Sequence, residues 1–159
     1  MVNTKYISGI SVLFRMCLAG VFIYAAVEKI AAPAEFAITI ENYRLIPSLF
    51  SNTIAIFLPW IELWCGIFLL FGIWQRGSAV LLAGMCLVFI AAILSAMIRG
   101  LEIDCGCFGL GEKISVYRIL EDLLLLVMAL FLIKFPSTRL TLHQLKKTRA
   151  EPVTQKPDA

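Results

Sequence analysis

The sequence predicts an all-α protein, a bundle of four transmembrane helices with both termini cytoplasmic. Of its 159 residues, 60% are hydrophobic, and the mean hydropathy is +0.89. A chain of this composition has too little polar surface to cover a soluble core, so we expect a membrane protein. The length suits one bundle rather than two domains.

Four apolar segments support this helix count. They lie at residues 7–26, 52–74, 77–98 and 115–135. Each is close to the roughly 20 residues that cross the hydrocarbon core of a bilayer. Arg15 interrupts the first segment, which is therefore unlike a signal peptide, and we expect it to be retained. Residues 1–135 then form the membrane domain, and residues 136–159 form a basic cytoplasmic tail that is partly disordered.

The first loop, residues 31–50, carries apolar residues at helical spacing. Phe36, Ile40 and Tyr43 recur every three or four positions. This pattern predicts a short amphipathic helix that lies on the membrane interface and is ended by Pro47. An irregular loop is the alternative.

Basic residues concentrate on one predicted side of the membrane. From Lys134 onward, six Lys and Arg residues stand against two acids, and Lys5 and the tight turn around Arg76 fall on the same side. The positive-inside rule makes this side cytoplasmic in a cell (inner) membrane. The loop between the third and fourth helices then faces the periplasm or exterior, where thiols can be oxidised. Because orientation in a bilayer explains the basic residues, we expect no nucleic acid partner.

Two charged residues lie near the centres of apolar segments. Arg15 and Glu62 each cost about 2.5 to 3.5 kcal/mol to insert there, so such residues usually pair and face the bundle interior. We expect the two to form a buried ion pair. It either fixes helix packing or, in the functional alternative, relays protons or contacts a bound cofactor.

A second charged set is expected near the outer surface. It contains Glu28 and Lys29 from the first helix and Arg118, Glu121 and Asp122 from the fourth. Arg118 and Asp122 are one helical turn apart and can face the same way. These residues either anchor the helices at the interface, or Lys29 or Arg118 stabilises a thiolate in the adjacent loop.

Two of the five cysteines lie outside the apolar segments. Cys17, Cys65 and Cys86 sit within helices, where cysteine commonly behaves as a small hydrophobe. Cys105 and Cys107 instead lie in a glycine-containing loop, and a strained disulfide between them would suit exchange. A structural disulfide and a soft-metal site for copper(I) or mercury are the alternatives. We expect no closed zinc site, because the one histidine lies in the tail.

Several motifs resemble the MauE branch of the DoxX-like redox-associated membrane proteins, over residues 12–133. The most specific is the element Asp104-Cys105-Gly106-Cys107-Phe108-Gly109 between the third and fourth helices. The others are Arg15, Glu28-Lys29, Tyr43, Pro47 and Pro59-Trp60-Ile61-Glu62-Leu63.

This resemblance implies a four-helix membrane protein that takes part in redox chemistry. MauE is implicated in maturing the disulfide-rich small subunit of methylamine dehydrogenase, often beside a thioredoxin-like partner. DoxX relatives are linked to thiosulfate and quinone oxidoreduction.

We therefore expect thiol–disulfide exchange by Cys105 and Cys107, with a thioredoxin-like protein or another periplasmic client as the partner. The supporting charge network would contain Arg15, Glu28, Lys29, Glu62, Arg118 and Asp122. No cofactor is required, although a quinone in the bilayer is compatible with this chemistry. The rival interpretation is a non-enzymatic assembly factor or transport subunit whose cysteines are structural or bind a metal.

Overall fold

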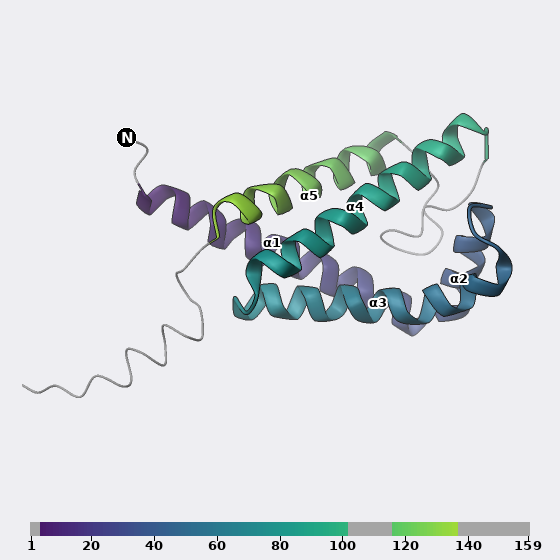
Figure 1. Cartoon of the computed structure of the whole chain (residues 1–159), viewed down its shortest axis with the longest axis horizontal. Helices are drawn as coiled ribbons and strands as arrows, with labels where there is room; N and C mark the ends of the chain where they lie inside the picture. The colour runs from purple at the N-terminus through teal and green to yellow at the C-terminus, as the bar shows by residue number, and fades with distance from the viewer. Residues whose placement is uncertain (1–3, 102–115, 137–159) are drawn as a thin grey trace, which may run out of the picture.

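The computed structural model describes residues 4–101 and 116–136, and all of the regular structure in them is helical (Figure 1). The helices are α1 Thr4–Ala31, α2 Pro33–Asn42, α3 Ser48–Phe71, α4 Gln75–Ile98 and α5 Val116–Lys134. The predicted all-α class is confirmed for this part of the chain. The predicted tail, residues 136–159, lies almost wholly outside it.

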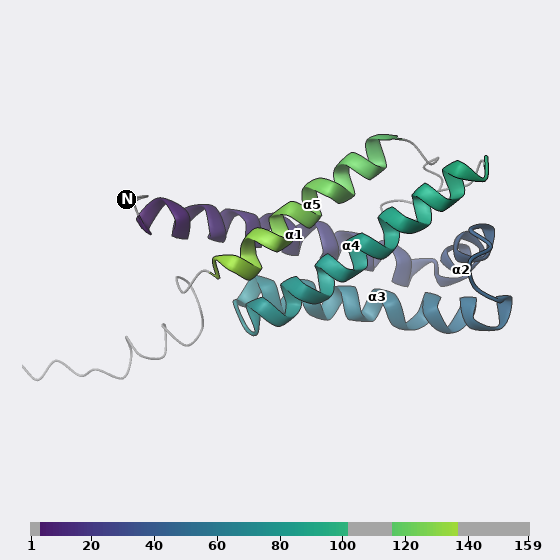
Figure 2. The same cartoon turned by 45° about the horizontal axis from the view of Figure 1, so that its top comes forward.

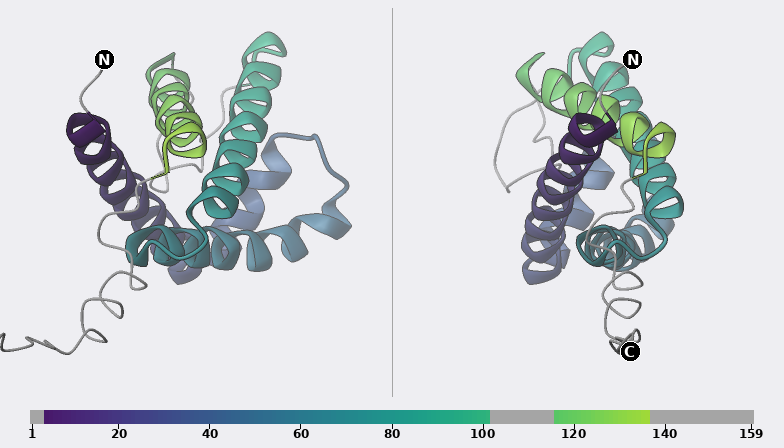
Figure 3. Two further views of the ribbon diagram at one scale, coloured as in Figure 1. Left: turned by 60° about the vertical axis from the view of Figure 1, so that its left-hand side comes forward. Right: turned by 90° about the vertical axis from the view of Figure 1, so that its left-hand side faces the viewer.

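The four long helices form a ring. The most extensive contacts are between α1 and α3 and between α4 and α5, while α3 with α4 and α1 with α5 close the ring (Figures 2 and 3). The start of α1 is tied to the end of α5, because the Ser11 hydroxyl donates to the Phe135 carbonyl at 2.8 Å. These ends and the α3–α4 turn form what we call the turn end. The α2 end holds α2, the end of α4 and the start of α5.

Three of the described helices are long and apolar enough to cross a membrane. The spans are Gly9–Ala31, Leu49–Phe71 and Gln75–Ile98, of 23, 23 and 24 residues. Large apolar side chains are exposed on the outer faces of these helices, as expected for a surface in contact with lipid. α5 has 19 residues and carries charged residues in its first two turns.

Two long helices end at a glycine in the left-handed region. Gly72 has φ 69° and Gly100 has φ 66°, a conformation that glycine adopts without steric cost. At the first, the N–H of Ile73 donates to the Phe68 carbonyl at 2.9 Å, which is part of a Schellman motif. α4 begins only three residues after Gly72, so the predicted tight turn is present but lies at residues 72–74, just before Arg76.

The first loop contains the predicted short helix. α2 ends at Asn42 rather than continuing to Pro47, and the irregular loop is the wrong alternative. Phe36 and Tyr43 are buried within the protein. Phe36 packs against α3 near Ala55, so the apolar face of α2 covers the bundle.

A close approach fixes how α1 and α3 pack together. A Cβ atom at Gly66 would lie 2.7 Å from Cγ1 of Ile23 and 3.3 Å from the Ala19 carbonyl oxygen. Small residues at such crossings let helix backbones approach closely within a membrane. The contact places residues 19–23 of α1 beside Gly66, and it determines which charged residues can meet.

Candidate functional site

Lys29 and Glu62 form an ion pair inside the bundle. Lys29 lies in the last turn of α1 and Glu62 in the middle of α3. The ammonium group donates to both carboxylate oxygens of Glu62, each at 2.9 Å. The side chains are only 4% and 1% exposed. Both charges are therefore removed from water, and each depends on the other for compensation.

Two aromatic rings flank the same ammonium group. The Lys29 Nζ lies 5.3 Å from the ring centroid of Phe36 in α2 and 5.2 Å from that of Phe89 in α4. Cation–π attraction is stronger when the cation is desolvated, as it is here. Lys29 thus connects four helices, because α1 supplies the cation and α2, α3 and α4 supply its neighbours.

The prediction that Glu62 pairs with Arg15 is wrong, because Glu62 pairs with Lys29. Arg15 is fully buried in α1, but it lies fourteen residues before Lys29, or about 21 Å along the helix axis. The contact at Gly66 places Arg15 beside the end of α3 instead. α1 also extends to Ala31. Lys29 therefore lies at the level of Glu62 and forms the ion pair with its carboxylate.

Asp122 adds a third charged residue to this cluster. It lies in the second turn of α5, is 2% exposed and is within electrostatic range of Lys29 and Arg118. Cys86 of α4 is within range of both Asp122 and Glu62. All five helices therefore contribute to one region, which we call the Lys29 cluster. Its members are Lys29, Phe36, Glu62, Cys86, Phe89 and Asp122.

The remaining members of the expected outer set are more exposed. The Arg118 guanidinium bonds to Glu121 at 2.7 Å, with side-chain exposures of 17% and 54%. The Tyr24 hydroxyl donates to Glu28 at 2.6 Å. The expected set is therefore divided. Lys29 and Asp122 are inside the bundle, whereas Glu28, Arg118 and Glu121 lie toward its surface.

Three cysteines belong to the described helices, and all three are free thiols. Cys65 and Cys86 pack in the main apolar cluster, as expected of small hydrophobes. Cys17 is exposed on α1. Cys105 and Cys107 lie outside the described residues, so their roles stay predictions. In residues 4–101 and 116–136, no three His, Cys, Asp or Glu side chains are grouped to hold a metal ion.

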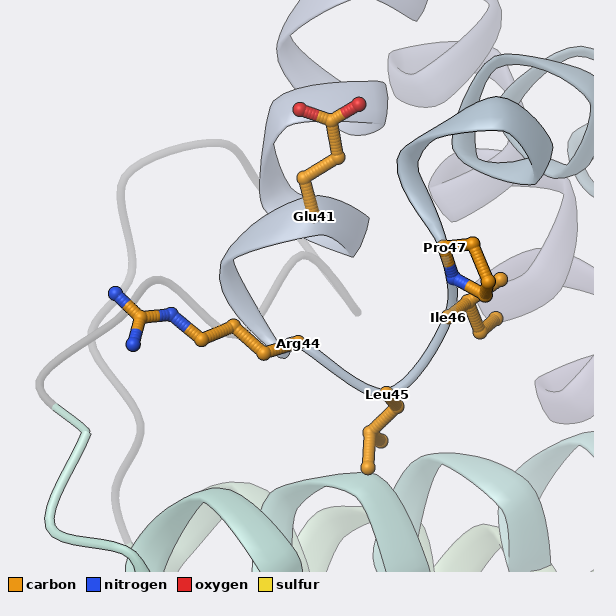
Figure 4. A pocket seen from close by; sticks show the side chains of 5 residues that line it. All are labelled: Glu41, Arg44, Leu45, Ile46 and Pro47. Atoms are coloured by element: carbon orange, nitrogen blue, oxygen red, sulfur yellow. The ribbon is translucent and has the colours of Figure 1, made fainter.

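The surface at the α2 end has a shallow pocket where α2 leads into α3 (Figure 4). It is lined by Glu41, Arg44, Leu45, Ile46 and Pro47. Beside it, the Arg99 guanidinium donates to the Tyr43 carbonyl and ties α4 to this corner. Leu101 and Ile119 pack in the same cluster as Tyr43. The residues that flank segment 102–115 therefore belong to the α2 end.

The sequence did not single out Phe89 or the burial of Asp122. The sequence around Phe89 is that of an ordinary apolar helix and does not indicate a cation–π contact. Only the fold, which brings this ring of α4 close to Lys29 of α1, shows it. The arrangement can stabilise a buried charge and connect α2 to the bundle. These features define a small all-α membrane protein with a charge cluster between its helices.

Comparison with known proteins gives the family. The profile of methylamine utilisation protein MauE matches residues 7–135. MauE of Paracoccus denitrificans is 36% identical over 119 residues, which cover 73% of this chain and 64% of that protein. MauE of Methylophilus methylotrophus is 32% identical over 140 residues, which cover 86% and 72%. The chain belongs to the MauE family, as its motifs indicated.

The chain spans less than two thirds of the Paracoccus denitrificans relative. MauE of Paracoccus versutus, 34% identical over 119 residues, is likewise covered over 64% of its length. No solved structure matches the chain.

Proposed function

We propose that this chain is a membrane component of methylamine utilisation that supports the maturation of a periplasmic client, such as the small subunit of methylamine dehydrogenase. Membership of the MauE family supports this, because the matched relatives carry methylamine utilisation in their names. The described helices suit a protein that works from within the bilayer. A thioredoxin-like protein is the proposed soluble partner.

The proposed topology has four spans, with α5 as the fourth. Alternating helix directions put Arg76 and Lys134 toward the turn end and Leu101 and Val116 at the α2 end. With basic residues on the cytoplasmic side, segment 102–115 faces the periplasm. This opposition of the two ends is the observation that carries the proposal, because in the proposed orientation Cys105 and Cys107 would face an oxidising compartment.

The proposed reaction is thiol–disulfide exchange. The thiolate of one cysteine attacks a partner disulfide, forms a mixed disulfide and releases one partner thiolate. The other cysteine, as its thiolate, then attacks the mixed disulfide, so that a Cys105–Cys107 disulfide forms and the partner leaves reduced. Two electrons pass to the partner, and the reverse sequence returns them. A quinone in the bilayer is a compatible final acceptor.

The charged residues have separate roles in this proposal. Lys29 is bonded to Glu62 within the bundle, so it supports helix packing. Arg118 lies in the first turn of α5, close to segment 102–115, and is the better candidate to favour a thiolate there. Its bond to the exposed Glu121 is weak enough to rearrange.

A trapped intermediate tests the reaction. In Cys107→Ser the resolving thiol is missing, so Cys105 should remain joined to a periplasmic protein in a mixed disulfide that a reductant releases. Cys105→Ser is tested in parallel, since either residue can attack. Cys17→Ser is the matched control, because Cys17 is an exposed thiol on a helix and its loss should change nothing. Full methylamine-dependent growth of the Cys105→Ser/Cys107→Ser variant, with no adduct in either single variant, would refute the proposal.

The buried ion pair favours a second candidate function, a non-enzymatic assembly or transport subunit. In that case the charged interior matters and the cysteines only brace the loop or hold a soft metal. Glu62→Gln in a folded protein discriminates between the two. Loss of function with an unchanged thiol titration supports the second candidate, and retained function with a reactive cysteine pair supports exchange.

A further inference from the structure

A groove lies between α1 and α5. It has a volume of about 500 Å³, within the range of roughly 300 to 1,000 Å³ that is typical of small-molecule sites. Its apolar lining consists of Cys17, Gly20 and Val21 from α1 and Leu124, Leu125 and Met128 from α5. Leu125 and Met128 are buried, whereas Leu124 is exposed. The groove therefore reaches from the bundle interior to a surface that faces lipid.

The contacts between α1 and α5 explain where the groove forms. At the turn end the two helices touch, because the Phe14 and Phe131 rings pack edge to face with their centroids 5.3 Å apart. Nearer the α2 end, a Cβ atom at Gly20 would have nothing within 4 Å. Gly20 thus leaves the space between the two helices open at this point.

Charged and hydroxyl groups line the end of the groove that is nearest α2. Here Arg118 bonds to Glu121 at 2.7 Å, and the Tyr24 hydroxyl donates to Glu28 at 2.6 Å. Tyrosine is common at the level of the lipid head groups. Met128 lies ten residues after Arg118, or about 15 Å along the helix axis. Over this distance the lining changes from charged to apolar, as expected for a site that holds an amphipathic molecule.

The charges at the polar end determine which head group fits. Arg118 is a cation, and Glu28 and Glu121 supply two carboxylates. Arginine binds phosphate groups well, and its five N–H donors can serve more than one acceptor, so a phosphate contact does not require Arg118 to leave Glu121. The two carboxylates would repel a purely anionic head group and attract an ammonium group. A primary ammonium group can also donate N–H bonds to them, which a trimethylated one cannot.

We propose that the groove binds a phospholipid whose zwitterionic head group carries a phosphate and a primary ammonium group. An acyl chain lies along the apolar lining between Gly20 and Met128. The phosphate contacts Arg118, and the ammonium group donates to Glu121 and Glu28. The bound lipid joins α1 to the first half of α5. This inference rests on the proposed four-span topology, but not on the thiol chemistry.

Native mass spectrometry of the full chain in detergent micelles tests this proposal. The protein is mixed with equal amounts of phosphatidylethanolamine, phosphatidylcholine and phosphatidylglycerol that have the same acyl chains, so that mass identifies the bound head group. The unmodified protein should retain one phosphatidylethanolamine in preference to the other two lipids. Gly20→Leu fills the groove and should lower this retention about tenfold.

Gly84→Leu is the matched control for Gly20→Leu. A Cβ atom at Gly84 also meets nothing within 4 Å, but the groove beside it is lined by apolar residues alone. This variant should retain phosphatidylethanolamine as the unmodified protein does. Both substitutions replace a helical glycine by a better helix former, so we expect both variants to fold.

Glu121→Gln tests the recognition of the head group. Loss of this carboxylate should lower the preference for phosphatidylethanolamine over phosphatidylglycerol about tenfold. The proposal is wrong if the unmodified protein retains no lipid, retains the three lipids equally or prefers the anionic one. It is also wrong if Gly20→Leu and Gly84→Leu retain equal amounts. Because Gly20→Leu keeps both loop cysteines, the mixed-disulfide experiment remains a separate test of the proposed function.

Discussion

Lys29–Glu62 and Arg118–Glu121 are both ion pairs in the half of the bundle nearest α2, but they are built in opposite ways. The first joins α1 to α3 at 2.9 Å, with side chains 4% and 1% exposed. The second lies within one turn of α5 at 2.7 Å, with side chains 17% and 54% exposed. The exposed pair has the shorter distance, but we expect it to be the weaker of the two, because water and salt screen exposed charges. Burial rather than distance decides how much each pair matters.

Breaking the buried pair should have the largest effect. Glu62→Gln leaves the Lys29 ammonium buried without its carboxylate, so we expect the free energy of unfolding to fall by about 3 to 5 kcal/mol. Denaturant titration of the protein in detergent micelles, followed by circular dichroism, measures this change. Glu121→Gln is the matched control, since it removes the same group from the exposed pair.

Replacing both partners sharpens the same test. Replacing a buried ion pair by apolar residues of similar volume often leaves the free energy of unfolding unchanged. For Lys29→Met combined with Glu62→Met we therefore expect a free energy of unfolding within about 1 kcal/mol of that of the unmodified protein. A double variant as unstable as Glu62→Gln alone would show that the pair contributes more than mutual compensation.

Disturbing the α1–α3 crossing should have the next largest effect on stability, because this crossing holds Lys29 at the level of Glu62. Gly66→Ala places a Cβ atom 2.7 Å from Ile23, and forcing the helices apart should cost about 1 to 3 kcal/mol. Gly84→Ala in α4 is the control, since nothing lies within 4 Å of a Cβ at Gly84. Equal stability of the two variants, measured by thermal unfolding, would contradict the close contact.

Removing one ring beside the cation should have a smaller effect. Phe89→Leu keeps most of the apolar volume but loses a cation–π contact made at 5.2 Å, which is worth about 0.5 to 2 kcal/mol. The matched control is Phe57→Leu, on an exposed face of α3. Equal destabilisation of the protein by Phe57→Leu and Phe89→Leu would show that the Phe89 ring does not stabilise the Lys29 ammonium group.

The exposed pair should matter least. Arg118→Gln is expected to change the free energy of unfolding by about 1 kcal/mol or less, and high salt should remove even that difference. Unfolding at low and high ionic strength measures both effects. A loss as large as that of Glu62→Gln would mean that Arg118 has a further buried role.

The sequence predicted the helices better than it predicted their partners. Runs of apolar residues locate α1, α3, α4 and α5, and the spacing of Phe36 and Tyr43 located α2. The spacing could not distinguish a surface in contact with lipid from one in contact with α3, because both are apolar.

The charged residues show why the ion-pair partners and the burial of single side chains could not be predicted from the sequence. Glu62 was recognised as a buried acid, but its partner depends on the α1–α3 register, which the contact at Gly66 sets and no local pattern encodes. Asp122 was expected near the membrane surface, yet packing in the bundle buries it. The roles of Cys105 and Cys107 stay predictions that depend on the family motif and on topology.

Sided labelling of cysteines tests the central claim most directly, that the cysteine pair and the Arg76 turn lie on opposite faces of the membrane. After reduction, a membrane-impermeant maleimide should label Cys105 and Cys107 from outside intact cells. Arg76→Cys, in a background where both loop cysteines are serine, should react only after the membrane is permeabilised. Labelling of both positions from the same side would contradict the account.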